Sequence, residues 1–166
     1  MKYWKAGIAF LVAFLIQTSL LNGISIGGYT PNLLLCLVIV FSFLYEEDMY
    51  GVVYGAVFGV LYDVCYNYII GPTPIGLVLV AIFILLVREY ANIENIINLW
   101  FVSVVSMVGY YLIHWGLCRI GGNPVGIVYA LRDLPGIGIY SLAVVTIIYF
   151  ILIRKVVRHR KDRYFR

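Results

Sequence analysis

The sequence predicts an all-α fold: a polytopic membrane helix bundle of about six transmembrane helices, with both termini cytoplasmic. Composition is the first observation, because 63% of the 166 residues are hydrophobic, only 12% are charged, and the mean hydropathy is +0.97. A soluble domain carries roughly 25% charged residues, so this chain has too few polar side chains to stay dissolved. The second observation is a series of apolar runs that approach the about 20 residues a spanning helix needs. These runs lack the alternation of barrel strands.

We expect a single transmembrane domain that covers residues 1–166. Turn residues or charges separate its apolar runs, and each run defines one span. The expected spans are residues 3–21, 31–45, 49–68, 75–90, 96–118 and 137–154, followed by a basic cytoplasmic tail at 155–166.

Start and stop signals justify the boundaries of these spans. The first run ends at Asn22-Gly23 and no A-x-A-like cleavage site follows, so we expect an uncleaved helix. The second run starts at Pro31, a favourable first helical residue, and ends before the acidic residues 46–48. Gly71 and the prolines after it end the third run. The fifth and sixth runs flank an outer loop, whose apolar stretch 125–131 is too short to span.

The basic residues set the orientation. Seven of the twelve Lys and Arg residues lie in the last thirteen positions, and Lys2, Lys5 and Arg88 fall on the same side in a six-span chain. Cytoplasmic flanks carry such an excess, so we expect a multi-pass membrane protein with both termini cytoplasmic. A basic cluster directly after an apolar run does not indicate nucleic-acid binding. We expect contact with anionic lipid or a cytoplasmic partner at Arg154, Lys155, Arg158, Arg160 and Lys161.

The third run carries small residues on one helix face. Gly51, Gly55 and Gly59 recur every fourth residue, and Asp63 continues the series. Residues four apart share a face, so another helix can approach this strip closely. Two interpretations stay open: packing within the bundle, or docking of a helix from another protein.

Asp63 is the carboxylate that lies well inside an apolar run. A charge inside the bilayer is costly, so we expect Asp63 to be neutral, paired or at a wet interface. Structural hydrogen bonding or helix capping, a partner contact, and ion or proton handling are the three alternatives. A relay would require a second ionisable group at similar depth, and His114 is the nearest in type.

The motifs of enzymes and cofactor sites are missing from the sequence. Cys36, Cys65 and Cys118 are far apart, so neither a disulfide framework nor a zinc site is expected. No stretch resembles a nucleophile–base pair, a phosphate-cradling loop or a metal set. We expect a protein that is not an enzyme and uses no cofactor.

Three stretches together resemble the rod shape-determining protein MreD family. The segment Pro31-Asn32-Leu33-Leu34-Leu35 opens the second run, and Phe43-Leu44-Tyr45-Glu46-Glu47 leads into the glycine strip. Gly71, Pro74, Gly76 and Leu77 then open the fourth run. The resemblance is dense from residue 17 to residue 79. The final run departs, because it offers Tyr140-Ser141 where the family pattern has an Asn.

The resemblance implies a non-enzymatic scaffold of the bacterial elongation (rod) complex, which organises peptidoglycan synthesis and cell shape. Its implied partners are MreC, the actin-like MreB and a membrane peptidoglycan synthase complex, besides membrane lipids. Pro31, Asn32, Gly51, Gly55, Gly59 and Asp63 become candidates for helix packing or partner contact.

The family is also similar in fold to the substrate-binding components of energy-coupling-factor transporters. The alternative function is therefore small-molecule (vitamin) binding, for which the pair Ala9 and Ala13 would suit docking to a coupling subunit. Such a pocket needs converging polar groups, and the first two outer loops offer only uncharged ones.

Overall fold

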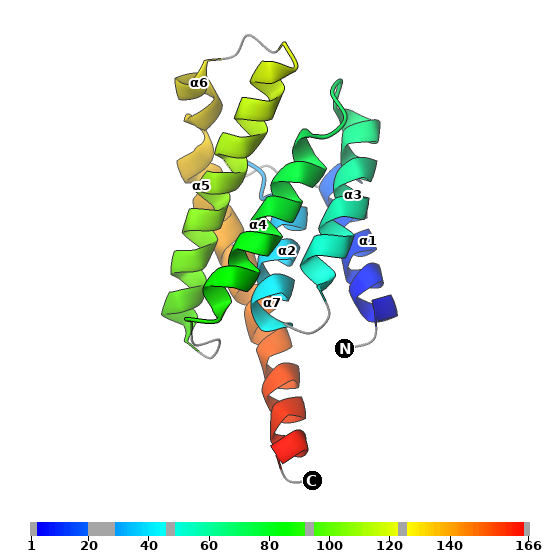
Figure 1. Ribbon diagram of the computed structural model, residues 1–166, viewed down its shortest axis with the longest axis vertical. Coiled ribbons are helices and arrows are strands. Elements are labelled where there is room, and N and C mark those ends of the chain that lie inside the picture. The colour runs from blue at the N-terminus through cyan, green and yellow to red at the C-terminus, as the bar shows by residue number, and fades with distance from the viewer. Residues whose placement is uncertain (1–2, 20–28, 46–48, 92–94, 123–125, 165–166) are drawn as a thin grey trace.

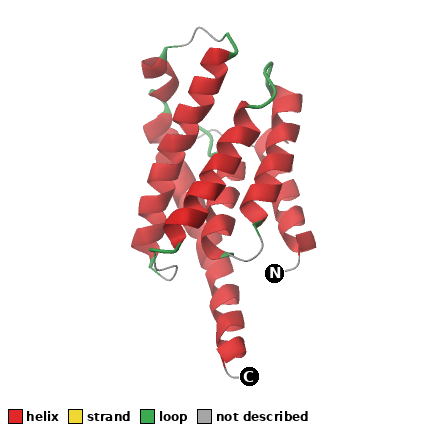
Figure 2. Ribbon diagram, in the orientation of Figure 1, coloured by secondary structure: helices red, strands yellow, loops and turns green. Residues whose placement is uncertain are grey.

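The computed structural model of the chain describes residues 3–19, 29–45, 49–91, 95–122 and 126–164, and its regular elements are α-helices (Figures 1 and 2). In chain order they are α1 (Tyr3–Ser19), α2 (Leu33–Leu44), α3 (Tyr50–Tyr66), α4 (Pro72–Arg88), α5 (Ile96–Ile120), α6 (Ile127–Leu131) and α7 (Leu134–Tyr164). The predicted helix bundle is therefore present. The six long helices run side by side, and α6 is a single short turn beside the start of α7 (Figure 1).

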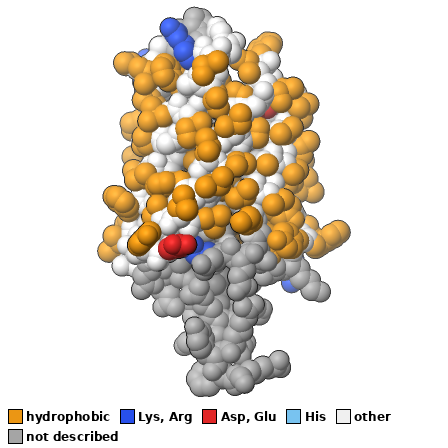
Figure 3. All heavy atoms as spheres, viewed as in Figure 1, with side chains coloured by type: hydrophobic (Ala, Val, Ile, Leu, Met, Phe, Trp, Pro, Cys, Tyr) orange, Lys and Arg blue, Asp and Glu red, His pale blue; other side chains and the backbone are white. Residues whose placement is uncertain are grey.

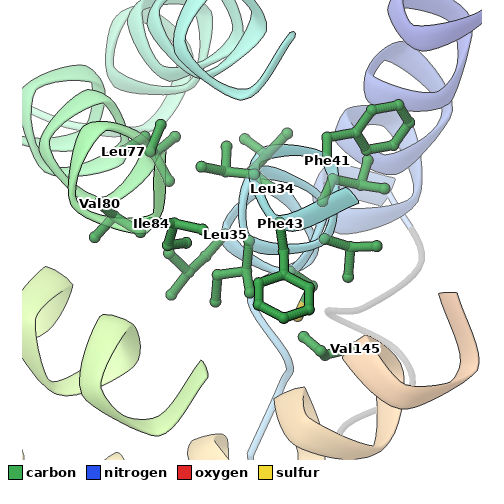
Figure 4. Packing of buried hydrophobic residues seen from close by; sticks show 14 of the residues in the cluster. Leu34, Leu35, Phe41, Phe43, Leu77, Val80, Ile84 and Val145 are labelled. Carbon is green, nitrogen blue, oxygen red and sulfur yellow. The ribbon is translucent and has the colours of Figure 1, made fainter. Parts of the chain in front are cut away.

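Helix α2 is the centre of the bundle. It packs against α1, α3, α4, α5 and α7, and all of its residues except Leu33 are buried. This arrangement explains its sequence, because a helix that is apolar all round must be enclosed on every side. Figure 4 shows α2 side chains such as Leu34 and Phe43 meeting Leu77 and Ile84 of α4 and Val145 of α7.

The helix starts differ from the expected ones for local reasons. The sequence suggested that Pro31 is the first residue of the second helix. In the structure Asn32 caps α2 by accepting a hydrogen bond from the Leu35 amide, so Pro31 lies before the helix. Helix α4 begins at Pro72, three residues before the predicted start, because proline suits the first turn and Gly71 before it adopts a positive φ of 130°.

Helix α7 continues past the predicted end of the last span. The segment of α7 that is apolar enough to cross a membrane ends at Arg154, and the helix runs on to Tyr164 through most of the expected basic tail 155–166, whose cytoplasmic location stays a prediction. No Gly or Pro follows Gly138 in this helix, so nothing in its sequence ends it at the membrane boundary. Its C-terminal part extends beyond the other helices (Figure 1).

The outer surface of the bundle is apolar, as a lipid-facing surface should be. Large hydrophobic side chains such as Trp4, Phe101 and Ile139 are more than 70% exposed, and orange side chains cover most of the described surface in Figure 3. Among the described residues, α5 and the segment Leu134–Arg154 of α7 are long and apolar enough to cross a membrane. Helices α2, α3 and α4 are also apolar but shorter.

Candidate functional site

The glycine strip (Gly51, Gly55 and Gly59) lies between α3 and its neighbours α2 and α4. A β-carbon at Gly51 would meet the Ser42 hydroxyl and the Val38 carbonyl of α2. A β-carbon at Gly55 would lie 3.2 Å from Val38 Cγ2 and 3.4 Å from Leu77 Cβ. The strip thus faces the interior of this chain along its whole length.

Gly59 makes the closest approach of the three. A β-carbon there would lie 2.7 Å from Pro74 Cα and 2.9 Å from Pro74 N, both backbone atoms of α4. Backbone atoms cannot rotate aside as a side chain can, so α3 and α4 can hold this spacing only with glycine at position 59. The close backbone contact places the N-terminal turn of α4 next to the turn of α3 that follows Gly59 and contains Asp63.

Asp63 lies one turn beyond Gly59 on the same face, and its side chain is fully buried. One carboxylate oxygen accepts hydrogen bonds from the amides of Gly71, at 2.8 Å, and Thr73, at 3.1 Å. The other oxygen accepts from Asn67 Nδ2 at 2.6 Å. Gly71 and Thr73 belong to the N-terminal end of α4, where free amides and the helix dipole favour an acidic side chain.

Asp63 belongs to a larger group of polar side chains, buried at Asp63, Thr73 and Tyr110 and partly exposed at the two asparagines. It is here called the polar cluster: Asn32, Asp63, Asn67, Thr73 and Tyr110. Asn67 also donates to Thr73 Oγ1 at 3.4 Å. The Tyr110 side chain of α5 lies near the side chains of Thr73 and Asn32. Hydrogen bonds of Asp63 and Asn67 therefore link the end of α3 to the start of α4, and the cluster also includes side chains of α5 and the start of α2.

The N-terminal end of α2 is held by two further side chains. The amide of Leu34 donates to Gln17 Oε1 of α1 at 3.1 Å. The amide of Asn32 donates to Ser141 Oγ of α7 at 3.3 Å. Ser141 therefore provides a buried polar group near the start of the final helix, where the family pattern has an Asn. Its backbone carbonyl also accepts from the Cys36 thiol at 3.5 Å.

The predicted residues fall into two sets. Asn32 and Asp63 meet in the polar cluster, the three glycines lie along the strip that leads to it, and Pro31 is buried just before the α2 cap. The basic residues 154–161 lie far from both, on the C-terminal part of α7. Their side chains after Arg154, and the acidic residues 46–48, lie outside the part of the chain whose side chains are described.

Sequence reasoning gave no role to Gln17, Thr73 or Tyr110. Asn67 had a detectable signal, since it follows Asp63 by four residues and shares its helix face. The contact of Gln17 crosses the loop to the next helix, and the contacts of Tyr110 join helices far apart in the chain, so neither follows from a spacing within one helix. Within the described residues, no group of three or more His, Cys, Asp or Glu side chains is placed to hold a metal ion.

Comparison with known proteins identifies one family. Residues 1–123 match the family described as rod shape-determining protein MreD, which covers the glycine strip and the polar cluster and confirms the resemblance seen in the sequence. Ser141 and the rest of α7 lie beyond the matched residues. No curated protein and no solved structure matches the chain.

Proposed function

We propose a function for this chain from one premise: it belongs to the family of the rod shape-determining protein MreD, and its role therefore lies in rod-shape determination. Within that role it acts as a non-enzymatic integral membrane scaffold of the bacterial elongation complex. It would help to position peptidoglycan synthesis, together with MreC, MreB and a membrane peptidoglycan synthase complex.

The proposed topology has six spans in one domain, with both termini on the cytoplasmic side of the bacterial inner membrane. The short helices α2, α3 and α4 fit this topology because they pack side by side with α5 and α7. Helix α2 is only about 18 Å long at the helical rise, less than the about 30 Å of a hydrocarbon core. Its complete enclosure by other helices removes the need to match the lipid.

The observation that carries the scaffold proposal is how the polar groups of the bundle are used. Asp63 occupies the N-terminus of α4, and Gln17 and Asn32 occupy that of α2. In membrane carriers, helix N-termini near the bilayer midplane serve as binding sites for the anionic groups of a substrate. Here the protein's own side chains take those positions, so the polar groups hold helices together.

The rival function, a vitamin-binding component of an energy-coupling-factor transporter, receives less support. Its docking pair was Ala9 and Ala13 on α1, but Ala13 is 8% exposed and Ala9 packs partly against the core. A pair that faces inward is poorly placed to dock a coupling subunit. Uptake of radiolabelled vitamins by the depleted strain would test the rival directly.

Depletion of the protein in its own host tests the scaffold proposal. We expect rods to round and swell before lysis, and expression of the full chain from a plasmid should restore them. Recovery of MreC and the synthase pair with the tagged protein from mild detergent would support the proposed partners. Normal rods after depletion, or normal rods with a loss of vitamin uptake, would overturn the proposal.

A further inference from the structure

Helices α3 and α4 pack side by side as a hairpin that is shorter than a membrane core (Figure 1). Each helix has 17 residues, which is about 25 Å at the helical rise, against about 30 Å for a hydrocarbon core. The exposed side of the hairpin is large and apolar, and it is here called the hairpin face. It includes Val53, Val57 and Val64 of α3 and Ile75, Leu79 and Leu86 of α4.

Polar groups and tyrosines mark both ends of the hairpin face. At one end, the chain between Asn67 and Gly71 is not helical, and irregular backbone that faces lipid is not tolerated in the hydrocarbon. Tyr66 and Tyr68 are exposed there and suit the headgroup level. At the other end, the charged and exposed Glu89 follows α4 directly. The hydrocarbon beside this face must therefore fit within the length of the two helices.

The last residue of α4, Arg88, does not lengthen the face by reaching outward. A short span can be accommodated by long basic side chains that extend to the headgroups, by association with other helices, or by a thinner bilayer. The Arg88 side chain is only 6% exposed, and it donates to the Ser42 carbonyl of α2 at 3.5 Å. Because Arg88 points into the bundle, the first of these three solutions does not apply.

The hairpin face is also poorly suited to association with another helix. Helices associate in lipid through small residues and polar side chains at their interface. All four glycines of α3 and α4 are buried within this chain, and so are Asp63 and Thr73. The exposed positions of these two helices, both of which are described in full, carry no Gly, Ala, Ser or Thr. A thinner bilayer is the solution that remains.

The opposite side of the bundle has the full length of a membrane core. The segment Leu134–Arg154 of α7, which packs on α2 and α5, has 21 residues and spans about 30 Å. Helix α5 also extends further than α4. A β-carbon at Gly76 would lie 3.0 Å from the Tyr110 ring, and from that contact α4 extends four residues to Pro72 and α5 ten residues to Ile120. The difference is about 9 Å at the helical rise.

We propose that the hairpin face thins the bilayer beside it and takes lipids with shorter acyl chains than those beside α7. The inference rests on the membrane-spanning topology proposed above. The thinning lies mainly in the leaflet next to the start of α4, because α4 falls short of α5 at that end. A mismatch of about 5 Å is enough to enrich shorter chains at this face about twofold.

Tryptophan fluorescence of the full-length chain in lipid vesicles can measure which lipids lie against each face. The three native tryptophans are first replaced, as Trp4→Phe, Trp100→Phe and Trp115→Phe. One reporter is then introduced at a time, Val57→Trp on the hairpin face or Ile147→Trp on α7. These positions are 50% and 61% exposed, and each lies seven residues from the proposed cytoplasmic end of its helical span, so the reporters are matched in depth.

Brominated dioleoyl phosphatidylcholine quenches each reporter, and unbrominated lipids compete with it for the same positions. At Val57→Trp we expect dimyristoleoyl phosphatidylcholine, which has shorter chains, to relieve quenching about twofold more effectively than dioleoyl phosphatidylcholine. At Ile147→Trp it should have no such advantage. Circular dichroism checks that each variant is folded, and Leu79→Trp on α4 repeats the measurement where Val57→Trp is not.

Three results would overturn the thinning. They are the same chain-length preference at both faces, a preference for dioleoyl lipid at the hairpin face, and weak quenching there by every brominated lipid. The last result would mean that a second copy of the chain covers the face. If the thinning fails in vesicles while depletion still rounds the cells, the scaffold function stands. Normal rods after depletion would instead overturn the scaffold and leave a measured chain-length preference intact.

Discussion

Two parts of the same face of α3 hold their neighbours by opposite means. At its N-terminal part, the glycine strip holds α2 and α4 by having no side chains, so that backbones meet at van der Waals distance. One turn later the fully buried Asp63 carboxylate holds α4 by accepting two hydrogen bonds from the amides of Gly71 and Thr73, and it accepts a third from Asn67 at the end of α3. Between lipid-embedded helices there is little hydrophobic driving force, so both shape and hydrogen bonding must contribute to association.

The comparison shows where the bundle should tolerate change. Close packing at the glycine strip is disrupted when side-chain volume is added. The loss of stability depends on whether the neighbouring atoms belong to the backbone or to a mobile side chain. Polar contacts fail when an acceptor is removed, because buried donors are then left without partners. The two mechanisms predict losses of different size in the free energy of unfolding at different positions on one helix face. Single substitutions can therefore distinguish them.

Removing the carboxylate should have the largest effect. Asp63→Ala leaves the amides of Gly71 and Thr73 and the Asn67 side chain without their acceptor in a buried site. We expect a loss of about 3 kcal/mol or more in the free energy of unfolding, since hydrogen bonds to charged groups exceed neutral ones. Titration of the purified protein from mild detergent into sodium dodecyl sulfate, followed by circular dichroism, measures this loss.

Asp63→Asn is the matched variant for the carboxylate. Its amide keeps the volume and one acceptor oxygen but directs a donor toward groups that are themselves donors. It should recover less than half of the stability that alanine loses. Full stability of the asparagine variant would show that size alone matters at this position and would contradict the capping role of Asp63.

Adding one methyl group at Gly59 should have the next largest effect. The new carbon in Gly59→Ala would meet backbone atoms of Pro74, so α4 must move as a unit. Overpacking of this kind costs about 2 kcal/mol, and the same unfolding titration measures it. Gly109→Ala on α5 is the control, because a β-carbon there meets nothing within 4 Å. Equal stability of the two variants would contradict the close approach of α3 and α4.

At Gly55 we expect a small added side chain to be tolerated and a large one to be disruptive. In Gly55→Ala the nearest atoms belong to the side chains of Val38 and Leu77, which can shift by a few tenths of an ångström. The gain in helix propensity of about 1 kcal/mol offsets that adjustment, so we expect a change near zero. Gly55→Leu should instead prevent assembly and abolish rod-shape support in the depleted host. Accumulation and normal rods with leucine would show that the strip tolerates bulk at its centre.

The glycine strip and the enclosed helix could be predicted from the sequence, and the polar cluster could not. Spacing of four residues identifies a face, and a uniformly apolar run such as 33–44 indicates burial on all sides. The sequence also shows that Asp63 needs partners. It does not show that those partners are the Gly71 and Thr73 amides, because they depend on the path of the turn before α4.

The family match ends at residue 123, and α7 shows why that boundary does not divide the structure. Ser141 of α7 contacts both Asn32 and Cys36 of the matched part. A serine in place of the expected asparagine supplies a shorter side chain with the same ability to accept a hydrogen bond. The matched and unmatched parts of the chain thus pack into one bundle.

Loss of the α2 cap should have a moderate effect. Asn32→Ala removes the acceptor for the Leu35 amide and the interaction with the Tyr110 hydroxyl. N-cap substitutions of this type cost about 1 kcal/mol. Asn32→Asp keeps the acceptor for the amide and serves as the matched variant. Unfolding titrations in which aspartate recovers most of the loss would assign it to the cap, whereas no recovery would assign it to the contact with α5.

A smaller loss than at Asn32 should come from a polar contact on the outside of the bundle. Trp100 Nε1 of α5 donates to Thr146 Oγ1 of α7 at 3.1 Å, at a position where Trp100 is 48% exposed. Thr146→Val keeps the shape and removes this bond. Interhelical hydrogen bonds between membrane helices contribute about 0.6 kcal/mol on average, because each partner finds other hydrogen-bonding groups when the helices separate.

Asp63 differs because its donors are enclosed by the fold. The ratio of the Asp63→Ala and Thr146→Val losses in the free energy of unfolding therefore measures how much burial strengthens a polar contact here. A loss at Thr146 as large as that at Asp63 would show that enclosure is not the cause.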